Sequence, residues 1–226
     1  MNDSPSQPSW RPVIVVLVMG FVFAAVGVRL STAVGFPGLG RWPLEVERLL
    51  LRPFLIGGGI GLLLIALSTL TPRQYRIPQL PFPDSLLPYI IGGTYEEILF
   101  RMFLLPLVLW LLFFIPSAQE LYADELFWGT AVTLSALYTL LQLTGIQGLF
   151  KIPTLGQIPA TLIVSLVLAS GFGSVVGAYY FREGGFVASY ALRVGVYLVW
   201  HIVWGAYAVP HGLVPHRREV EEQEGQ

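Results

Sequence analysis

Gly92-Gly93-Thr94-Tyr95-Glu96-Glu97-Ile98-Leu99-Phe100-Arg101 is the stretch that decides the fold, because it sets three ionisable side chains inside an apolar run from Leu86 to Ile115. A charge at the centre of a membrane helix costs about 2.5 to 3.5 kcal/mol on insertion scales, so such residues normally face a bundle interior and mark a functional site. Glu97 and Arg101 stand four apart with the acid first, the favourable order for an ion pair on one helix face. Glu96 projects about 100° away round the helix and is the free member of the three.

Two interpretations of these three residues remain open. A carboxylate placed between a second acid and an arginine can accept a proton from water, which predicts that Glu96 is a general base. In the structural alternative, Glu96, Glu97 and Arg101 form a polar clasp that joins helices.

The composition is that of an integral membrane protein. Of 226 residues, 54% are hydrophobic and only 12% are charged, against about 25% charged in soluble domains. A formal net charge of -1, with no basic run, argues against nucleic acid as a partner. The absence of cysteine excludes disulfides, thiolate metal sites and a cysteine nucleophile.

The apolar runs predict an all-α bundle of about six transmembrane helices, because a bilayer core is crossed by about 20 residues. The third run is longer than one upright span, so it either tilts or breaks near Pro106, and a break would give seven or eight helices. The expected spans are Val13 to Ala33, Leu49 to Leu70, Leu86 to Ile115, Leu126 to Ile146, Ile158 to Phe181 and Phe186 to Val209.

This organisation predicts a single transmembrane domain, residues 13–209, between a disordered tail, residues 1–12, and a charged tail, residues 210–226. We expect a multi-pass protein of the plasma membrane or another inner membrane, in contact with the lipid bilayer. The positive-inside rule places both termini in the cytoplasm. The arginines and lysine on that side are Arg11, Arg73, Arg76, Lys151, Arg217 and Arg218, against Arg41, Arg48, Arg52 and Arg182 on the other.

Glycines inside the second span do not form a phosphate loop. The run Gly57-Gly58-Gly59-Ile60-Gly61 follows no strand and lies within an apolar helix. Small residues at such positions let another helix backbone approach, so we predict close helix packing here.

Further polar residues lie at membrane depth. Gln142 sits in an apolar span and needs a polar partner or a water inside the bundle, either as a helix-bridging hydrogen bond or as part of a site. Arg193, Tyr197 and His201 follow one another at spacings of four on the last span. Because a buried arginine needs an acidic partner, and the acids at that depth are Glu96 and Glu97, the last span should pack on the third.

No metal or other cofactor is predicted. The chain has no HExxH pattern, and His201 is the one histidine clearly at membrane depth. The oligomeric state is left open by the sequence.

The residues resemble the CPBP intramembrane proteases, the group that includes the CAAX-prenyl endopeptidase Rce1 and bacteriocin-processing relatives, over about residues 86–207. The family motif EExxxR is intact as Glu96-Glu97-Ile98-Leu99-Phe100-Arg101. The FxxxH motif is similar to Tyr138-Thr139-Leu140-Leu141-Gln142, and the HxxxN motif to His201-Ile202-Val203-Trp204-Gly205.

The resemblance implies an endopeptidase whose glutamate-activated water attacks a peptide bond of a membrane-associated, and in some relatives prenylated, protein or peptide. Carried over by position, Glu96 is the base, Glu97 and Arg101 support it, Gln142 holds the water and His201 stabilises the oxyanion. Arg193, Tyr138 and Tyr197 are supporting residues.

Two departures from the family pattern leave a second hypothesis open. Gln142 can hold a water but cannot exchange a proton, and Gly205 offers no side-chain donor to an oxyanion. Arg193 could compensate electrostatically. The alternative is a catalytically impaired member that acts as a binding or assembly module for another membrane protein, whereas a transporter or channel is disfavoured because the chain shows neither repeats nor paired half-helices.

Overall fold

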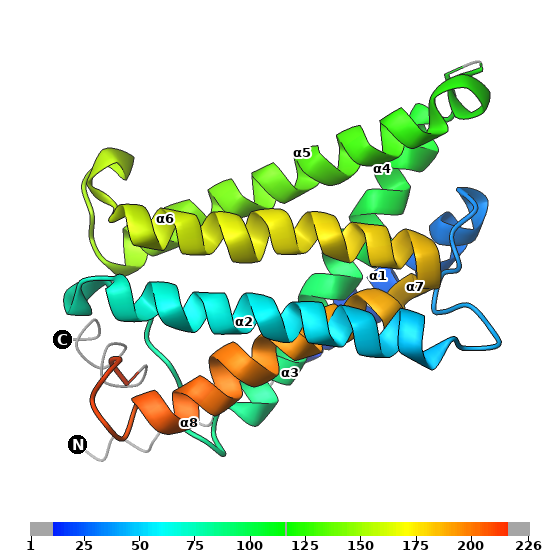
Figure 1. Ribbon diagram of the computed structural model, residues 1–226. Coiled ribbons are helices and arrows are strands. Elements are labelled where there is room, and N and C mark those ends of the chain that lie inside the picture. The colour runs from blue at the N-terminus through cyan, green and yellow to red at the C-terminus, as the bar shows by residue number, and fades with distance from the viewer. Residues whose placement is uncertain (1–10, 116, 217–226) are drawn as a thin grey trace, which may run out of the picture.

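The computed structural model describes residues 11–115 and 117–216, and all regular elements in these residues are helical. π-Helical turns continue several α-helices without a break, and two short 3-10 helices lie in loops (Figure 1). The α-helices are α1 Arg11–Ala33, α2 Arg52–Leu70, α3 Leu86–Glu97, α4 Leu105–Leu112, α5 Ala118–Leu149, α6 Ala160–Leu166, α7 Gly173–Tyr197 and α8 Trp204–Ala208. The π-helical segments are Glu47–Leu51, Ile98–Leu104, Val167–Phe172 and Leu198–Val203, and the 3-10 helices are Arg73–Tyr75 and Leu155–Gln157.

The predicted all-α membrane fold is confirmed. Within the described residues, 4 helical stretches are long and apolar enough to cross a membrane. Three of them correspond to the predicted first, second and fourth spans, and the last covers the predicted fifth and sixth. The stretches are Ile14–Ala33, Glu47–Leu70, Tyr122–Leu149 and Ala160–Ala208.

The last of these stretches is two helical passes that meet at Gly185. The backbone of Gly185 has φ +75°, and a Cβ on this residue would lie 2.6 Å from the carbonyl oxygen of Gly38. The N–H groups of Phe186 and Val187 donate to the carbonyls of Gly38 and Leu39, at 2.8 and 3.1 Å. The loop after α1 therefore satisfies the first N–H groups of the returning helix, and Figure 1 shows the chain running out along α6 and coming back towards α8.

The predicted third span is helical from Leu86 to Leu112 without a break at Pro106. It contains Glu96, Glu97 and Arg101, and it is not among the 4 apolar stretches. A proline ring normally clashes with the preceding helical turn. Here the turn before it is π-helical, and the Leu105 N–H donates to the carbonyl of Phe100, five residues back, which widens the turn.

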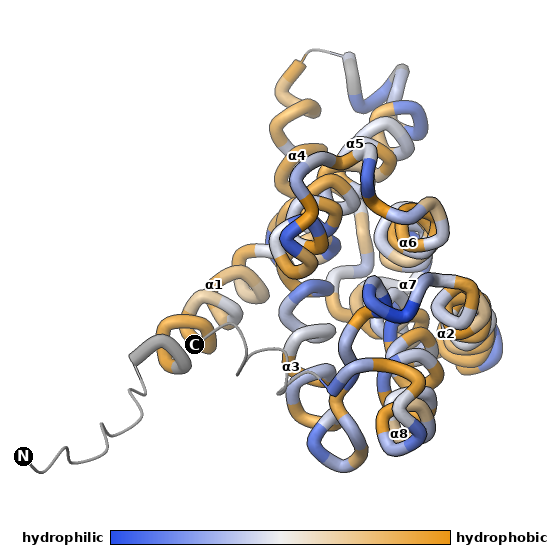
Figure 2. The backbone as a smooth tube through the Cα atoms, turned by 90° about the vertical axis from the view of Figure 1, so that its left-hand side faces the viewer, coloured by the Kyte–Doolittle hydropathy of each residue, from blue (hydrophilic) through white to orange (hydrophobic). Residues whose placement is uncertain are grey.

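α7 lies in the middle of the bundle (Figure 2) and packs against α2, α3 and α5. A Cβ on Gly57 of α2 would lie 2.0 Å from the Leu192 carbonyl oxygen, and one on Gly195 of α7 would lie 2.1 Å from that of Phe54. The two backbones therefore touch at glycines, which confirms the predicted packing role of the glycines in the second span.

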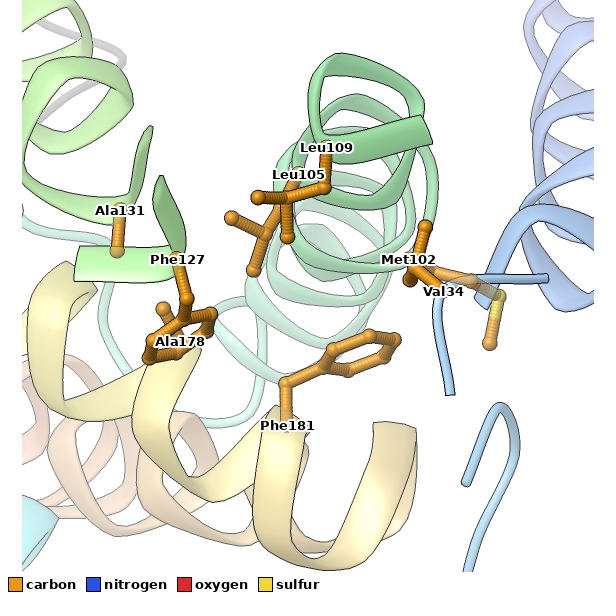
Figure 3. Close-up of a cluster of buried hydrophobic side chains, with 8 residues drawn as sticks. All are labelled: Val34, Met102, Leu105, Leu109, Phe127, Ala131, Ala178 and Phe181. Atoms are coloured by element: carbon orange, nitrogen blue, oxygen red, sulfur yellow. The ribbon is translucent and has the colours of Figure 1, made fainter. Parts of the chain in front are cut away.

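An apolar cluster fixes the other side of α7. Phe181 and Phe127 are almost fully buried, with 0% and 2% exposure, and Figure 3 shows their rings pointing into the space between the helices. The cluster comes from the end of α1, residues 98–112, α5 and α7, and comprises Val34, Met102, Leu105, Leu109, Phe127, Ala131, Ala178 and Phe181. It holds the pass that carries the acidic motif against α7.

Both predicted tail boundaries shift. The helix α1 already includes Arg11, and the rest of the predicted N-terminal tail, residues 1–10, lies outside the described residues. At the other end, residues 210–216 pack on the loop before α3: Val214 is 4% exposed, and Arg76 Nη1 donates to the Leu213 carbonyl at 2.7 Å. The charged tail that was predicted from residue 210 therefore begins no earlier than residue 217.

Candidate active site

One internal cavity of about 470 Å³ brings the predicted site residues together. Its walls come mainly from α3, α5, α7 and the π-helical segments that follow α3 and α7, and α2, α6, the π-helical segment after α6 and the loop before α3 complete them. All eight predicted residues line it: Glu96, Glu97, Arg101, Tyr138, Gln142, Arg193, Tyr197 and His201. Their catalytic or supporting roles stay predictions.

Glu97 is the buried anchor of the acidic side. Its side chain is 1% exposed, and its Oε1 lies 3.3 Å from Arg101 Nη1. Arg193 Nε donates to the same oxygen at 2.6 Å. The ion pair between Glu97 and Arg101 is as predicted from the spacing. Arg193 was expected to approach one of the two acids, and it contacts both.

Glu96 is the accessible carboxylate, with a side chain 28% exposed. Its Oε2 accepts hydrogen bonds from Arg193 Nη1 and from the Tyr197 hydroxyl, the latter at 3.1 Å. Two carboxylates and two guanidinium groups therefore face one another, and their formal charges cancel when both acids are ionised. This balance offsets part of the desolvation cost of four charged groups inside the bundle.

Small residues make this arrangement possible. A Cβ on Gly93 would lie 2.8 Å from Tyr197 Cε2, and a Cβ on Gly177 would lie 3.3 Å from the Arg101 guanidinium. Each glycine therefore leaves room for a site residue of a neighbouring helix.

Gln142 is tied to its neighbour one helical turn earlier. Its Nε2 donates to the Tyr138 hydroxyl at 2.8 Å, and the Tyr138 ring packs on Phe100 with ring centroids 4.6 Å apart. The amide oxygen of Gln142 is the end that can accept a hydrogen bond from a water in the cavity.

His201 is framed by two residues that the sequence analysis did not include in the site. Its Nδ1 lies 2.9 Å from Gln79 Oε1, and the Tyr89 ring stacks on the imidazole with centroids 3.9 Å apart. The Tyr89 hydroxyl also donates to Gln79 Oε1, at 3.2 Å. Tyr89 could have been identified from the sequence, because it stands seven residues before Glu96 and so lies on the same helix face. Gln79 lies in a loop between prolines, where no periodicity applies.

Within residues 11–115 and 117–216, no group of three or more His, Cys, Asp or Glu side chains could hold a metal ion. The described acids of the cavity are instead neutralised by arginines.

These observations define the class of the protein. It is an all-helical membrane protein whose cavity is lined by two carboxylates, two arginines and an imidazole. Comparison with family models identifies the match as the type II CAAX prenyl endopeptidase Rce1-like family, over residues 78–199. The match covers more than half of the chain, so the protein belongs to this family, and the predicted resemblance is confirmed. It includes the first two motifs and ends before His201. Comparisons with curated proteins and with solved structures found no match.

Proposed function

We propose that the protein is an intramembrane endopeptidase in which Glu96 activates the attacking water. The observation that carries this proposal is the difference between the two cavity carboxylates: Glu96 is 28% exposed and Glu97 is 1% exposed. A general base must reach the water from which it takes a proton. Glu97, buried between Arg101 and Arg193, supports the site electrostatically.

The reaction follows from the positions of these groups. A water held by Glu96 and the amide oxygen of Gln142 gives a proton to Glu96, and its oxygen forms a bond to the carbonyl carbon of the peptide. The oxyanion that results is stabilised by the positive charge of Arg193 and by His201. The C–N bond then breaks, and Glu96 returns the proton to the leaving nitrogen, so the carboxylate is restored.

The substrate is a membrane-associated protein or peptide, and the family name directs the first tests to prenylated chains. The helical passes cross the membrane several times, with both termini in the cytoplasm. On this topology the loops before α3 and after α5 lie on the cytoplasmic side. We place the entrance of the site on that side, because Ile77 of the loop before α3 lines the cavity.

A second function, a binding or assembly module without catalysis, is favoured by one specific observation. The Glu96 carboxylate accepts hydrogen bonds from Arg193 and Tyr197, and the Gln142 amide nitrogen is already bound to Tyr138. A site whose polar groups satisfy one another could hold a peptide without hydrolysing it.

The test is hydrolysis by the purified protein in liposomes, with a prenylated CAAX peptide and a library of membrane-embedded peptides as substrates and mass spectrometry as the readout. Glu96→Gln keeps the size of the side chain and should lower turnover by about 10²- to 10⁴-fold, the range of general acid–base catalysis. Glu125→Gln, an exposed glutamate on α5, is the matched control and should leave turnover unchanged. Peptide binding by the wild type without any cleavage would establish the binding module instead.

A further inference from the structure

The loop before α3 lies behind His201 and contributes no predicted site residue. Gln79 belongs to the loop before α3, stands 122 positions from His201 in sequence, and is 0% exposed. Its Oε1 lies 2.9 Å from His201 Nδ1 and accepts the Tyr89 hydroxyl at 3.2 Å. A fully buried amide from a distant part of the chain therefore contacts the imidazole that lines the cavity.

The backbone holds Gln79 in place from the opposite side. Its N–H donates to the Pro215 carbonyl at 3.1 Å, and Gln79 pairs with His216 in an isolated parallel bridge. Pro78 and Pro81 flank it and favour an extended backbone. The amide is therefore presented to His201 by a segment whose position is fixed.

Gly205 makes room for this segment. A Cβ at residue 205 would lie 2.8 Å from the Leu80 carbonyl oxygen and 3.7 Å from Gln79 Cβ. A side chain at 205 would therefore push the segment away from His201. The absence of a side chain at residue 205 and the position of Gln79 beside His201 therefore belong to one packing arrangement.

We propose that Gln79 is the positioning residue of His201, which it reaches from the loop before α3. Because an amide oxygen only accepts hydrogen bonds, it keeps a proton on His201 Nδ1. Neutral His201 then carries its lone pair on Nε2. It stabilises an oxyanion in its doubly protonated form, with Nε2 having taken a proton from solvent before the reaction, while Gln79 still accepts from Nδ1.

The proposed tautomer of His201 depends on which end of the Gln79 amide faces the imidazole. Its Nε2 is buried and has no hydrogen-bond partner in the part of the chain that the structure describes. The reverse orientation would place Nε2 beside His201 Nδ1 and force the neutral imidazole to carry its proton on Nε2. The two orientations therefore predict opposite tautomers.

The first experiment reads the tautomer directly, by nitrogen-15 NMR of histidine-labelled full-length protein in lipid nanodiscs, at a pH where His201 is neutral. The His201 signals are assigned by their loss in His201→Asn. Wild type and Gln79→Glu should carry the proton on Nδ1, because both residues offer an oxygen acceptor. Gln79→Met, of similar volume but without an acceptor, should give a mixture of tautomers. A wild-type proton on Nε2, or a Gln79→Met spectrum identical to wild type, overturns the proposal.

The second experiment rests on the proposed function and measures peptide hydrolysis. Gln79→Met should lower kcat by about 10- to 10²-fold, the usual cost of losing a partner that orients a working histidine, with KM little changed. Gln79→Glu should restore most of the loss. Gln147→Met, which alters another glutamine at the same end of the bundle, should match wild type. If the wild type hydrolyses nothing while its tautomer still depends on Gln79, the positioning role stands and the proposed function fails.

Discussion

The two sides of the cavity are built in different ways. The acidic side, Glu96, Glu97 and Arg101, comes from six consecutive residues of one helical pass and gains Arg193 from α7. The imidazole side joins His201 to Gln79, which is 122 positions away and lies in a loop. One side is specified by local spacing, and the other depends on the packing of the chain ends.

The two sides of the cavity are therefore sensitive to different kinds of substitution. On the acidic side the cost of a change is electrostatic, because four charged groups in a poorly solvated space neutralise one another. On the imidazole side the cost is geometric, because the place of Gln79 depends on the absence of a side chain at Gly205 and on the contact with Pro215. Substitutions that act on charge and on shape should therefore separate the two sides.

The largest effect on stability is expected from Glu97→Ala. It leaves Arg101, whose side chain is 5% exposed, without the carboxylate with which it forms an ion pair. Removing one partner of a buried pair costs about 3 to 5 kcal/mol, which should appear as a lower free energy of unfolding in a denaturant titration of the detergent-solubilised protein. Glu96→Ala is the control and should cost clearly less, because Glu96 is partly exposed. Equal costs for the two variants would show that the acids are not divided into an anchor and an accessible base.

The next effect is a gain of activity that depends on the acidic side. Gln142→His introduces a second ionisable group beside Glu96, which can share the proton and orient the water more strongly. Turnover of the peptide should rise by up to about 10²-fold, the low end of general acid–base catalysis. In the same background Glu96→Gln should remove the activity. If wild type and Gln142→His are both inert while the protein still binds the peptide, the binding-module function is correct.

Sequence reasoning could predict the acidic side and most of the passes because both follow from periodicity. The spacing of Glu97 and Arg101 and the length of the apolar runs are local properties. It could not find Gln79, since no local rule says where a loop between prolines meets a helix far along the chain. Nor could it foresee that Pro106 stays inside a helix, because this depends on a π-helical turn whose hydrogen bonds are not encoded in hydropathy.

A smaller effect, and one of unexpected sign, is predicted for Gly205→Asn, which restores the residue of the family motif. The new Cβ would lie 2.8 Å from the Leu80 carbonyl oxygen, so the loop before α3 has to move. We expect a destabilisation of about 1 to 3 kcal/mol, as for other overpacked sites, together with a loss of activity rather than a gain. Gly145→Asn is the matched control, since a Cβ there meets nothing within 4 Å. Higher activity in Gly205→Asn would show that the site works with an amide at position 205 and does not depend on the present position of Gln79.

The smallest effect should come from Tyr89→Phe, which tests how the imidazole side is held. The substitution removes the hydroxyl that donates to Gln79 Oε1 at 3.2 Å but keeps the ring that stacks on His201 at 3.9 Å. Losing one neutral hydrogen bond costs about 0.5 to 1.5 kcal/mol, so thermal unfolding should shift by a few degrees at most. The His201 tautomer should stay on Nδ1, because Gln79 still accepts from it. Tyr89→Leu, which also removes the stacked ring, should cost more than Tyr89→Phe. If instead Tyr89→Phe alone moves the proton to Nε2, the hydroxyl rather than the Gln79 amide controls the imidazole, and the two sides of the cavity are coupled through α3.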